Sequence, residues 1–581
     1  MERYVDSSDG VRIAVYEQGN PDGPTLVLVH GWPNSHVMWD GVVALLADRF
    51  RIVTYDNRGA GASSVPKPVK AYTMGRFADD FAAVIGELSP GNPVHVLAHD
   101  WGSVGVWEYL SRPEASDRVA SFTSVSGPSA DHYAAVIREG LARPYRPVRF
   151  IRALNLALRL FYWIPLSIPV LAPAAMRAGF GRRIQHANAR DARPDHIHYG
   201  DINADAANSL KIYRANALRS ATGVKTDHYV SVPVQLVVNA NDPVVKPYAY
   251  DSESRWVARL WRRDIAAGHW SPFSHPAVVA RSVRELVDFL GGKPPSRALL
   301  RAQVGRPREY FGDTLVSVTG AGSGIGRETA LAFAREGAEI VVSDIDEASV
   351  KDTAAQIAAR GGVAHAYILD VSDADAVERF AEQVCGDHGV PDIVVNNAGV
   401  GHAGLFLDTP REEFDRVLDI NFGGVVNCCR SFGRRLVDRG TGGHVVNVAS
   451  MAAYSPQQSM NAYSTSKAAV FMFGDCLRAE LDQAGVGLTT VCPGVIDTNI
   501  VHTTRFDVPA GKRANVEARR AQLEKLFAAR RYGPEKVAKA IVSAVKKNKP
   551  IRPVAPEAYF VYVAAHLLPQ AMRSSARASV M

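Results

Sequence analysis

A sharp turn at residues 98–102 holds the first side chain that could do chemistry. The segment PVHVLAHDWGSVG has the pattern of a strand, a turn and the start of a helix, with Asp100 in the turn. Such a strained turn needs small residues two places to either side, and Ala98 and Gly102 meet that need. A carboxylate there can attack an sp³ carbon that bears a leaving group, forming an ester that water must hydrolyse. Asp is also a common helix N-cap, but the preceding strand and the small flanks favour a nucleophile.

Three further pieces could complete this site. The motif HGWP, after a predicted strand, can offer the backbone N–H of Trp32 to an oxyanion, with the N–H of Trp101 as its partner. Asp242 ends the predicted strand QLVVNAND and can orient a base, and His269 in the loop AAGHW can be that base. The chain order nucleophile, acid, base is typical of α/β-hydrolases. We therefore expect Asp100, Asp242 and His269 to act together.

A second group of chemical residues begins with a glycine-rich turn. The segment TLVSVTGAGSGIG predicts a strand, a turn and a helix that starts near Arg327. Glycines let a backbone approach a pyrophosphate at a helix N-terminus. The residues expected to do so are Gly320, Ser323, Gly324, Ile325 and Gly326. Asp344 ends the next predicted strand, where it would bind ribose hydroxyls and repel a 2′-phosphate, so NAD is expected rather than NADP.

Tyr463 and Lys467 are one helical turn apart, so their side chains share a face. The ammonium group and the positive nicotinamide are expected to lower the pKa of the Tyr463 phenol. The phenol could then exchange a proton with an alcohol or a carbonyl while the cofactor does the hydride chemistry. Ser450 ends the predicted strand VVNVAS and could hydrogen-bond the substrate oxygen, and Asp370 at another strand end could contact the adenine.

The composition narrows the number of domains, the compartment and the classes of partner. The 581 residues suffice for two large domains, and 47% hydrophobic and 22% charged residues are ordinary for a globular protein. None of the 5 cysteines has metal-ligand spacing, so no metal site is expected and a reducing cytoplasm fits. The first residues carry no apolar signal segment. A net charge of +7 without a basic, aromatic-rich stripe disfavours nucleic acid as a partner.

Strand and helix signals alternate along the chain, which predicts two α/β domains with largely parallel sheets. We place a hydrolase domain at residues 1–292 with a helical cap at about 130–228, a linker at 293–312, a doubly wound Rossmann-type domain at 313–555 and a tail at 556–581. The linker is rich in Gly, Pro and Arg and shows no strong period.

The first half resembles the epoxide hydrolase branch of the α/β-hydrolase superfamily. The matching motifs are HGWP at 30–33, DNRGAGAS at 56–63, HDWG at 99–102, NDP at 241–243 and GHW at 268–270. The resemblance implies two cap tyrosines that donate hydrogen bonds to the opening epoxide. Tyr213 in IYRAN matches the family pattern with Ile in place of Trp, and Tyr162 is expected as the other. Haloalkane dehalogenases share the Asp nucleophile and remain the alternative.

The second half resembles the short-chain dehydrogenase/reductase superfamily over residues 313 to about 550. The matching motifs are TGAGSGIG, NNAG, INFGG, YSTSK and PGVIDT. The resemblance implies Asn421, Ser450, Tyr463 and Lys467 as active residues. The further cofactor contacts that it implies are Val371, Asn397, Ala398, Gly399, Pro493, Gly494 and Thr498.

Apolar segments in the cap and the tail point to a lipid-like substrate. The run at 160–176 is almost wholly apolar but contains three prolines, so we expect a pocket wall; contact with a membrane surface stays open. The tail could dock on a membrane, cover the dehydrogenase pocket or pair subunits. The chain looks like bacterial fusions associated with lipid metabolism, which implies fatty or mycolic-type epoxides. A non-catalytic lipid-binding role for one domain is a further alternative.

Overall fold

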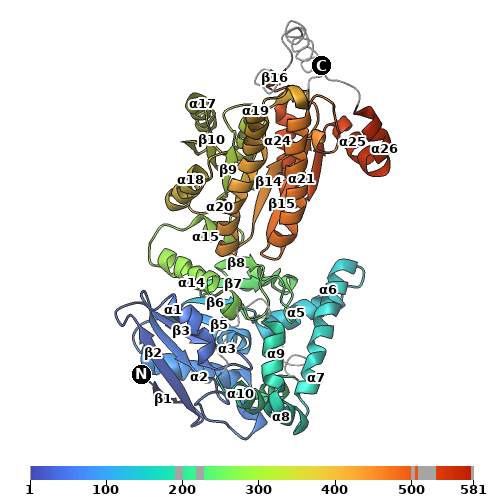
Figure 1. Ribbon diagram of the computed structural model, residues 1–581. Coiled ribbons are helices and arrows are strands. Elements are labelled where there is room, and N and C mark those ends of the chain that lie inside the picture. The colour runs from blue at the N-terminus through green and yellow to red at the C-terminus, as the bar shows by residue number, and fades with distance from the viewer. Residues whose placement is uncertain (1, 190–199, 218–227, 499–503, 508–531, 577–581) are drawn as a thin grey trace. The chain divides into compact units, whose positions relative to one another are not determined.

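The computed structural model describes residues 2–189, 200–217, 228–498, 504–507 and 532–576 (Figure 1). The chain divides into two compact units, Met1–Arg306 and Pro307–Met581. Each unit is built on a sheet of mainly parallel strands joined through helices. The predicted fold class, an α/β-hydrolase fold with a helical cap followed by a Rossmann-type domain, is confirmed.

The sheet of the first unit has eight strands in the order β1-β2-β4-β3-β5-β6-β7-β8. Only β1–β2 and β2–β4 are antiparallel pairs. The central strands are near-continuous apolar runs, as expected where helices cover both faces of a sheet. The strands are β1 Glu2–Asp6, β2 Arg12–Gly19, β3 Thr25–Val29, β4 Arg51–Tyr55, β5 Val94–His99, β6 Val119–Val125, β7 Val234–Asn239 and β8 Leu260–Ile265.

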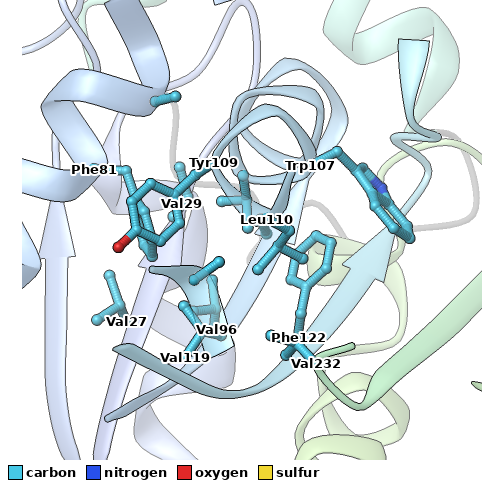
Figure 2. Close-up of a cluster of buried hydrophobic side chains, with 14 of the residues drawn as sticks. Val27, Val29, Phe81, Val96, Trp107, Tyr109, Leu110, Val119, Phe122 and Val232 are labelled. Atoms are coloured by element: carbon cyan, nitrogen blue, oxygen red, sulfur yellow. The ribbon is translucent and has the colours of Figure 1, made fainter. Parts of the chain in front are cut away.

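Apolar side chains of the sheet pack against α2 (Met74–Leu88) and α3 (Asp100–Leu110) in the core of this unit. Figure 2 shows part of this cluster, in which Phe81 of α2 meets Tyr109 of α3 edge to face at 5.0 Å between ring centroids. The packing holds α3, the helix whose first residue is the predicted nucleophile. The other described helices of the unit outside the cap are η1 His36–Trp39, α1 Asp40–Ala44, η2 Val69–Tyr72, α4 Ala115–Arg118, η6 Pro247–Tyr250, η7 Glu253–Arg255, α13 Ser271–Ser274, α14 Pro276–Leu290 and α15 Arg297–Ala302.

A helical cap is inserted between β6 and β7, and its described elements are all helices. They are α5 Ala130–Leu141, α6 Pro147–Arg159, η3 Leu160–Tyr162, α7 Trp163–Leu166, α8 Leu171–Ala175, η4 Met176–Phe180, α9 Gly181–Asn188, α10 Ile202–Ser209 and α11 Lys211–Asn216. Among the described residues, no single helix is long and apolar enough to cross a membrane. One pair, Pro147–Leu166 with Leu171–Ala187, passes the same test only in combination and is bent by 83°.

The predicted linker at 293–312 contains a short helix. Residues Arg297–Ala302 form α15, and Leu299 and Ala302 are buried against Trp261 and Leu286. Val304 N–H also donates to the Leu260 carbonyl at 2.9 Å. Only two side chains of this short helix are buried, too few to stand out as a period in the sequence.

The sheet of the second unit has seven parallel strands in the order β11-β10-β9-β12-β14-β15-β17. The order reverses between β9 and β12, and ligands of such sheets bind at the carboxyl ends of the strands beside this point. The strands are β9 Leu315–Thr319, β10 Glu339–Asp344, β11 Ala364–Ile368, β12 Ile393–Asn396, β14 Gly443–Val448, β15 Val486–Pro493 and β17 Ile551–Val554, and the small pair β13 His402–Gly404 and β16 Arg505–Asp507 lies apart.

Helices connect these strands and bury apolar faces against them. They are α16 Gly324–Ala334, α17 Glu347–Ala358, α18 Ala374–His388, η8 Phe406–Asp408, α19 Arg411–Leu418, η9 Asp419–Gly423, α20 Gly424–Arg439, η10 Met451–Ala453, α21 Asn461–Asp482 and α24 Pro534–Lys546. The predicted tail forms α25 Pro556–Leu567 and α26 Pro569–Ser575. Tyr454 donates to the Ala558 carbonyl at 3.2 Å, so α25 packs on this unit.

Candidate active sites

The turn after β5 has the strained geometry of a nucleophile elbow. Asp100 has a φ of 49°, a left-handed conformation that is rare for residues other than glycine. Neighbouring backbones approach so closely that only glycine fits beside it. A Cβ on Gly102 would lie 2.2 Å from the His30 carbonyl oxygen, and one on Gly127 would lie 2.3 Å from the Asp100 carbonyl oxygen.

The structure brings the three predicted triad residues together. His269 Nδ1 lies 2.8 Å from Asp242 Oδ2, and His269 Nε2 lies 3.6 Å from Asp100 Oδ1. The other carboxylate oxygen of Asp242 accepts from the backbone N–H of Val244 and Val245, at 2.6 and 3.0 Å, which fixes its orientation. His269 is thus held with one nitrogen on Asp242 and the other toward Asp100.

The predicted oxyanion donors also border Asp100. The backbone N–H of Trp32 donates to Asp100 Oδ2 at 3.0 Å, so this oxygen is already engaged by the HGWP loop. Trp101 follows Asp100 as the second residue of α3. The indole N–H of Trp32 donates to the Ala206 carbonyl at 3.1 Å, which ties the loop to cap helix α10.

Charge and burial set the protonation of His269. Burial opposes its charged form, but the carboxylates of Asp242 and Asp100 outweigh this and raise the pKa of His269 to about 10. Burial opposes the charged form of Asp242 as well, yet the imidazolium holds the pKa of that carboxyl below its usual value. The buried His269 ring is therefore an imidazolium at neutral pH, and it lies between two carboxylates.

A cavity of about 530 Å³ opens onto Asp100 and His269. Its wall is almost entirely apolar, and Tyr162 and Tyr213 supply the phenol groups in it. The two tyrosine rings meet edge to face at 5.9 Å between centroids, and Tyr213 also contacts the rings of Trp32 and Trp101. Burial raises the pKa of both phenols, and the Asp100 charge adds to the effect.

The contacts of Asn216 explain why an Asn follows Tyr213 in the IYRAN motif. Its side-chain oxygen accepts from the Met74 N–H at 3.1 Å, and its side-chain N–H donates to the Tyr72 carbonyl at 2.9 Å. These bonds fasten α11 to the body of the hydrolase domain and hold Tyr213 in the cavity that contains Asp100. The sequence did not single out Trp163, whose ring lies 5.2 Å from that of Trp101, because no motif surrounds it.

Asp205 was also missed. Its carboxylate accepts from the Gly61 N–H at 2.8 Å and so joins cap helix α10 to the DNRGAGAS loop. Burial raises the pKa of Asp205 to about 7. Only the partner loop carries a motif, so no sequence pattern pointed to this carboxyl.

In the second unit, the glycine-rich turn is packed as tightly as the elbow. Gly320 has a φ of 63°, and a Cβ there would lie 2.7 Å from the Cα of Ala398. A Cβ on Gly326 would lie 2.1 Å from the Gly320 carbonyl oxygen. Asn397 donates to the Thr319 and Gly320 carbonyls at 3.0 and 3.1 Å, so the predicted NNAG segment supports the turn.

The strand ends place further predicted cofactor residues beside this turn. Asp344 ends β10, and its Oδ2 accepts from the Gly322 N–H at 2.8 Å. The Thr498 side chain lies 3.6 Å from the position of a Cβ on Gly324. Ser323 is the N-cap residue of α16, and Ile325 is in its first turn.

Other predicted contacts lie farther along the sheet edge. Asp370 is exposed and accepts from Ser372, whereas Val371 is buried beside Gly424. Pro493 ends β15, and a Cβ on Gly494 would lie 2.4 Å from Glu557 of α25. The tail helix thus borders the PGVIDT segment.

Asn421 lies in the π-helical turn η9 between α19 and α20. Its oxygen accepts from the Val400 N–H at 2.7 Å, and its N–H donates to the Val400 carbonyl at 3.0 Å and to Ser466 at 3.1 Å. A π-turn is a frequent feature of functional sites. Through Asn421, this turn joins the end of the NNAG segment to the helix that carries Tyr463.

Tyr463 and Lys467 face the end of β14. Lys467 Nζ donates to the Val448 carbonyl at 3.0 Å and lies 5.9 Å from the centroid of the Tyr463 ring. A Cβ on Gly399 would lie 3.3 Å from Lys467 Nζ, so the NNAG segment also reaches this group. Burial lowers the pKa of Lys467 to about 8.

The expected lowering of the Tyr463 pKa counts the charge of the nicotinamide and stays a prediction; the protein groups alone act in the other direction. Burial raises that pKa, and a hydrogen bond with Ser450 opposes the rise. The ammonium group of Lys467 binds a backbone carbonyl, and burial dominates the pKa of the phenol in the protein alone.

Two family models match the chain in the order of its two units. One described as "alpha/beta hydrolase fold" matches residues 24–276, and one described as "short chain dehydrogenase" matches residues 314–508. "Probable oxidoreductase EphD" of Mycobacterium tuberculosis (strain ATCC 25618 / H37Rv) is 68% identical over 586 residues, which cover 100% of this chain and 99% of that protein. The chain belongs to the EphD family of α/β-hydrolase–short-chain dehydrogenase fusions.

Other relatives, with dehydrogenase names, match part of the EphD-family chain. A 1-deoxy-11-beta-hydroxypentalenate dehydrogenase of Streptomyces exfoliatus is 37% identical over 203 residues, which are 35% of this chain and 74% of that protein. A crystal structure of a short chain dehydrogenase/reductase from Burkholderia phymatum in complex with NAD is 27% identical, covers 46% of this chain and 97% of its own, and has a TM-score of 0.42.

Membership of the short-chain dehydrogenases makes the second unit an oxidoreductase and implies a nicotinamide cofactor. The residues present fit such a group. The turn before α16 admits only glycine at Gly320, and the first turn of α16 admits only glycine at Gly326, as a cradle for a pyrophosphate at a helix N-terminus requires. Asp344, at the same turn, offers carboxylate oxygens for ribose hydroxyls.

Proposed function

We propose that the chain is a bifunctional enzyme of lipid metabolism, with an epoxide hydrolase in the first unit and an NAD-dependent alcohol dehydrogenase in the second. One observation carries the hydrolase part. A carboxylate on a strained turn lies 3.6 Å from a carboxylate-oriented histidine in an apolar cavity that also holds two phenols.

The residues support a two-step hydrolysis. Asp100 Oδ1 attacks an epoxide carbon, the C–O bond of the ring breaks, and Tyr213 or Tyr162 gives its proton to the released oxygen. Once the ester has removed the charge of Asp100, the His269 imidazolium returns a proton to the tyrosinate, and the neutral ring takes a proton from a water molecule, which attacks the ester carbonyl of Asp100. The tetrahedral intermediate expels the diol oxygen, which takes up the proton of the added hydroxyl. Trp32 N–H stabilises the developing charge on Oδ2, which it already contacts at 3.0 Å. The products are a vicinal diol and the free carboxylate.

Two phenols favour an epoxide over a haloalkane. The oxygen released from an epoxide must gain a proton, whereas a departing halide needs none. Burial raises the pKa of both Tyr162 and Tyr213, so each phenol keeps a proton to donate at neutral pH. Release of halide from a haloalkane would favour the dehalogenase alternative.

In the second unit, a nicotinamide cofactor, when bound, would accept the hydride from the alcohol. Tyr463 would hold or receive the alcohol proton, Ser450 would hydrogen-bond the substrate oxygen, and Lys467 would orient the ribose and add positive charge. Asp344 favours NAD because its carboxylate would repel the 2′-phosphate of NADP. Oxidation of one hydroxyl of a vicinal diol gives a hydroxy ketone, so the two reactions can follow each other.

The test is incubation of the purified chain with a long-chain epoxy fatty acid, first without and then with NAD, followed by mass analysis. We expect a diol without NAD and a hydroxy ketone after NAD is added. Asp100→Ala should abolish the diol, and Tyr463→Phe should form the diol but not the ketone. If the wild-type chain forms no diol from epoxides but releases halide from haloalkanes, the hydrolase assignment is wrong.

A further inference from the structure

The outer surface of the cap combines exposed apolar side chains with positive charge. Helix α6 has a buried face with Ala153 and Leu156, but a second apolar row on its other side remains exposed. That row continues through η3 and α7. Its members are Val148, Ile151, Leu154, Leu158, Phe161 and Ile164, with exposures of 40–63%.

Arginines accompany this surface without acidic neighbours in sequence. Residues 141–190 contain nine arginines and no Asp or Glu. Arg143, Arg146 and Arg149 are exposed and lie just before or within the first turn of α6, beside the apolar row. Few soluble surfaces present so many large apolar side chains together, and such patches mark binding sites.

The segment that follows this row in the chain borders the active-site cavity. Ile168, Leu171 and Phe180 line the cavity that contains Asp100, yet they are 42%, 69% and 47% exposed. The chain from α6 to η4 therefore carries both the exposed apolar row and the cavity rim. A molecule held against this surface would have a short apolar path to the nucleophile.

We propose that this cap surface docks on an anionic lipid bilayer, and that the substrate enters the hydrolase cavity from the lipid. The apolar row would insert at the boundary between headgroups and acyl chains, while the arginines bind anionic headgroups. A second copy of the chain fits less well, because a symmetric contact would bring the same positive surface against itself. The docking does not depend on the reaction; entry of an epoxide from the lipid rests on the proposed function.

Vesicle flotation of the full-length chain tests the docking. We expect it to float with phosphatidylcholine vesicles that contain phosphatidylglycerol, to float weakly with phosphatidylcholine alone, and to be released by high salt. Each basic side chain near an anionic surface strengthens binding by about fivefold, so Arg143→Gln, Arg146→Gln and Arg149→Gln together should weaken it by on the order of a hundredfold. Ile151→Glu with Leu158→Glu should also prevent flotation.

A matched control uses the exposed apolar side chains of the tail helix. Phe560→Glu with Leu567→Glu alters side chains that are each 73% exposed, in the other unit, and should leave flotation unchanged. Loss of flotation in this control but not in the cap variants would overturn the proposal. So would a dimer of the wild-type chain that Ile151→Glu dissociates, since the face would then belong to a second copy.

Turnover separates docking from catalysis. The cap variants should hydrolyse a short, water-soluble epoxide at the wild-type rate but lose at least tenfold on a long-chain epoxide presented in anionic vesicles. Unchanged turnover in vesicles would overturn entry from the lipid. Failure on both epoxides by the wild-type chain would contradict the proposed function and leave the flotation result to judge the docking.

Discussion

The protonation of His269 should depend on the charge of Asp100. Its pKa of about 10 arises because two carboxylates flank the buried ring, opposing the effect of burial. In the proposed reaction, formation of the ester removes the charge of Asp100 at the moment when His269 must become a base. Asp100→Asn mimics that neutral state without changing the shape of the side chain.

The size of the effect follows from the distance. Opposite unit charges 3.6 Å apart, as for His269 Nε2 and Asp100 Oδ1, attract by about 4–5 kcal/mol at an effective dielectric constant near 20. This is roughly a thousandfold in the acid dissociation constant of the imidazolium. The substitution should therefore carry the pKa of His269 from about 10 down toward neutrality.

Titration of the histidine ring signals by NMR measures this directly. In the wild-type chain the His269 signal should stay that of an imidazolium through neutral pH, and in Asp100→Asn it should titrate near neutrality. His99 is an internal control, because burial lowers its pKa to about 4 and it should stay neutral in both proteins at that pH. The same midpoint for His269 in both proteins would refute the idea that ester formation switches the base on.

Three further perturbations test other parts of the two sites. Gly31→Ala places a Cβ 2.6 Å from both Cβ and Oδ2 of Asp100, so hydrolysis should fall by about a hundredfold with the dehydrogenase rate unchanged; near-normal hydrolysis would contradict the packing. Asp344→Ala should weaken NAD binding by roughly ten- to a hundredfold through lost charge-assisted hydrogen bonds, and an unchanged preference for NAD over NADP would exclude the assigned role. Burial raises the pKa of Asp205 from 3.8 to about 7, so folding favours the protonated form of this carboxyl. As the pH rises from 3.8 to about 7, the wild-type chain should therefore lose on the order of 4 kcal/mol of its free energy of unfolding relative to Asp205→Asn. Unfolding of both proteins across that range checks this, and a constant difference would contradict it.

Local backbone geometry explains which parts of the sites were predictable. The elbow at Asp100 and the turn at Gly320 each need small residues at fixed offsets, because strand and helix backbones nearly touch there. Such constraints leave a pattern in the sequence. The pKa of Tyr463 left no pattern in the sequence, because it depends on how deeply the phenol is buried and on which group the Lys467 ammonium binds.

Tyr162 shows why cap residues are harder to predict than triad residues. Its sequence neighbourhood matched the epoxide hydrolase pattern poorly, yet its ring lies 5.9 Å from that of Tyr213 in the cavity that contains Asp100. Tyr213 is positioned by the side chain of Asn216 three residues away, which leaves a local pattern, whereas Tyr162 is positioned by the packing of η3 and α7 against rings from other segments. A cap can keep a phenol over the nucleophile with many packing solutions. The motifs at the turns therefore predict the chemistry of this enzyme. The choice of substrate depends on cap packing, which sequence patterns specify only weakly.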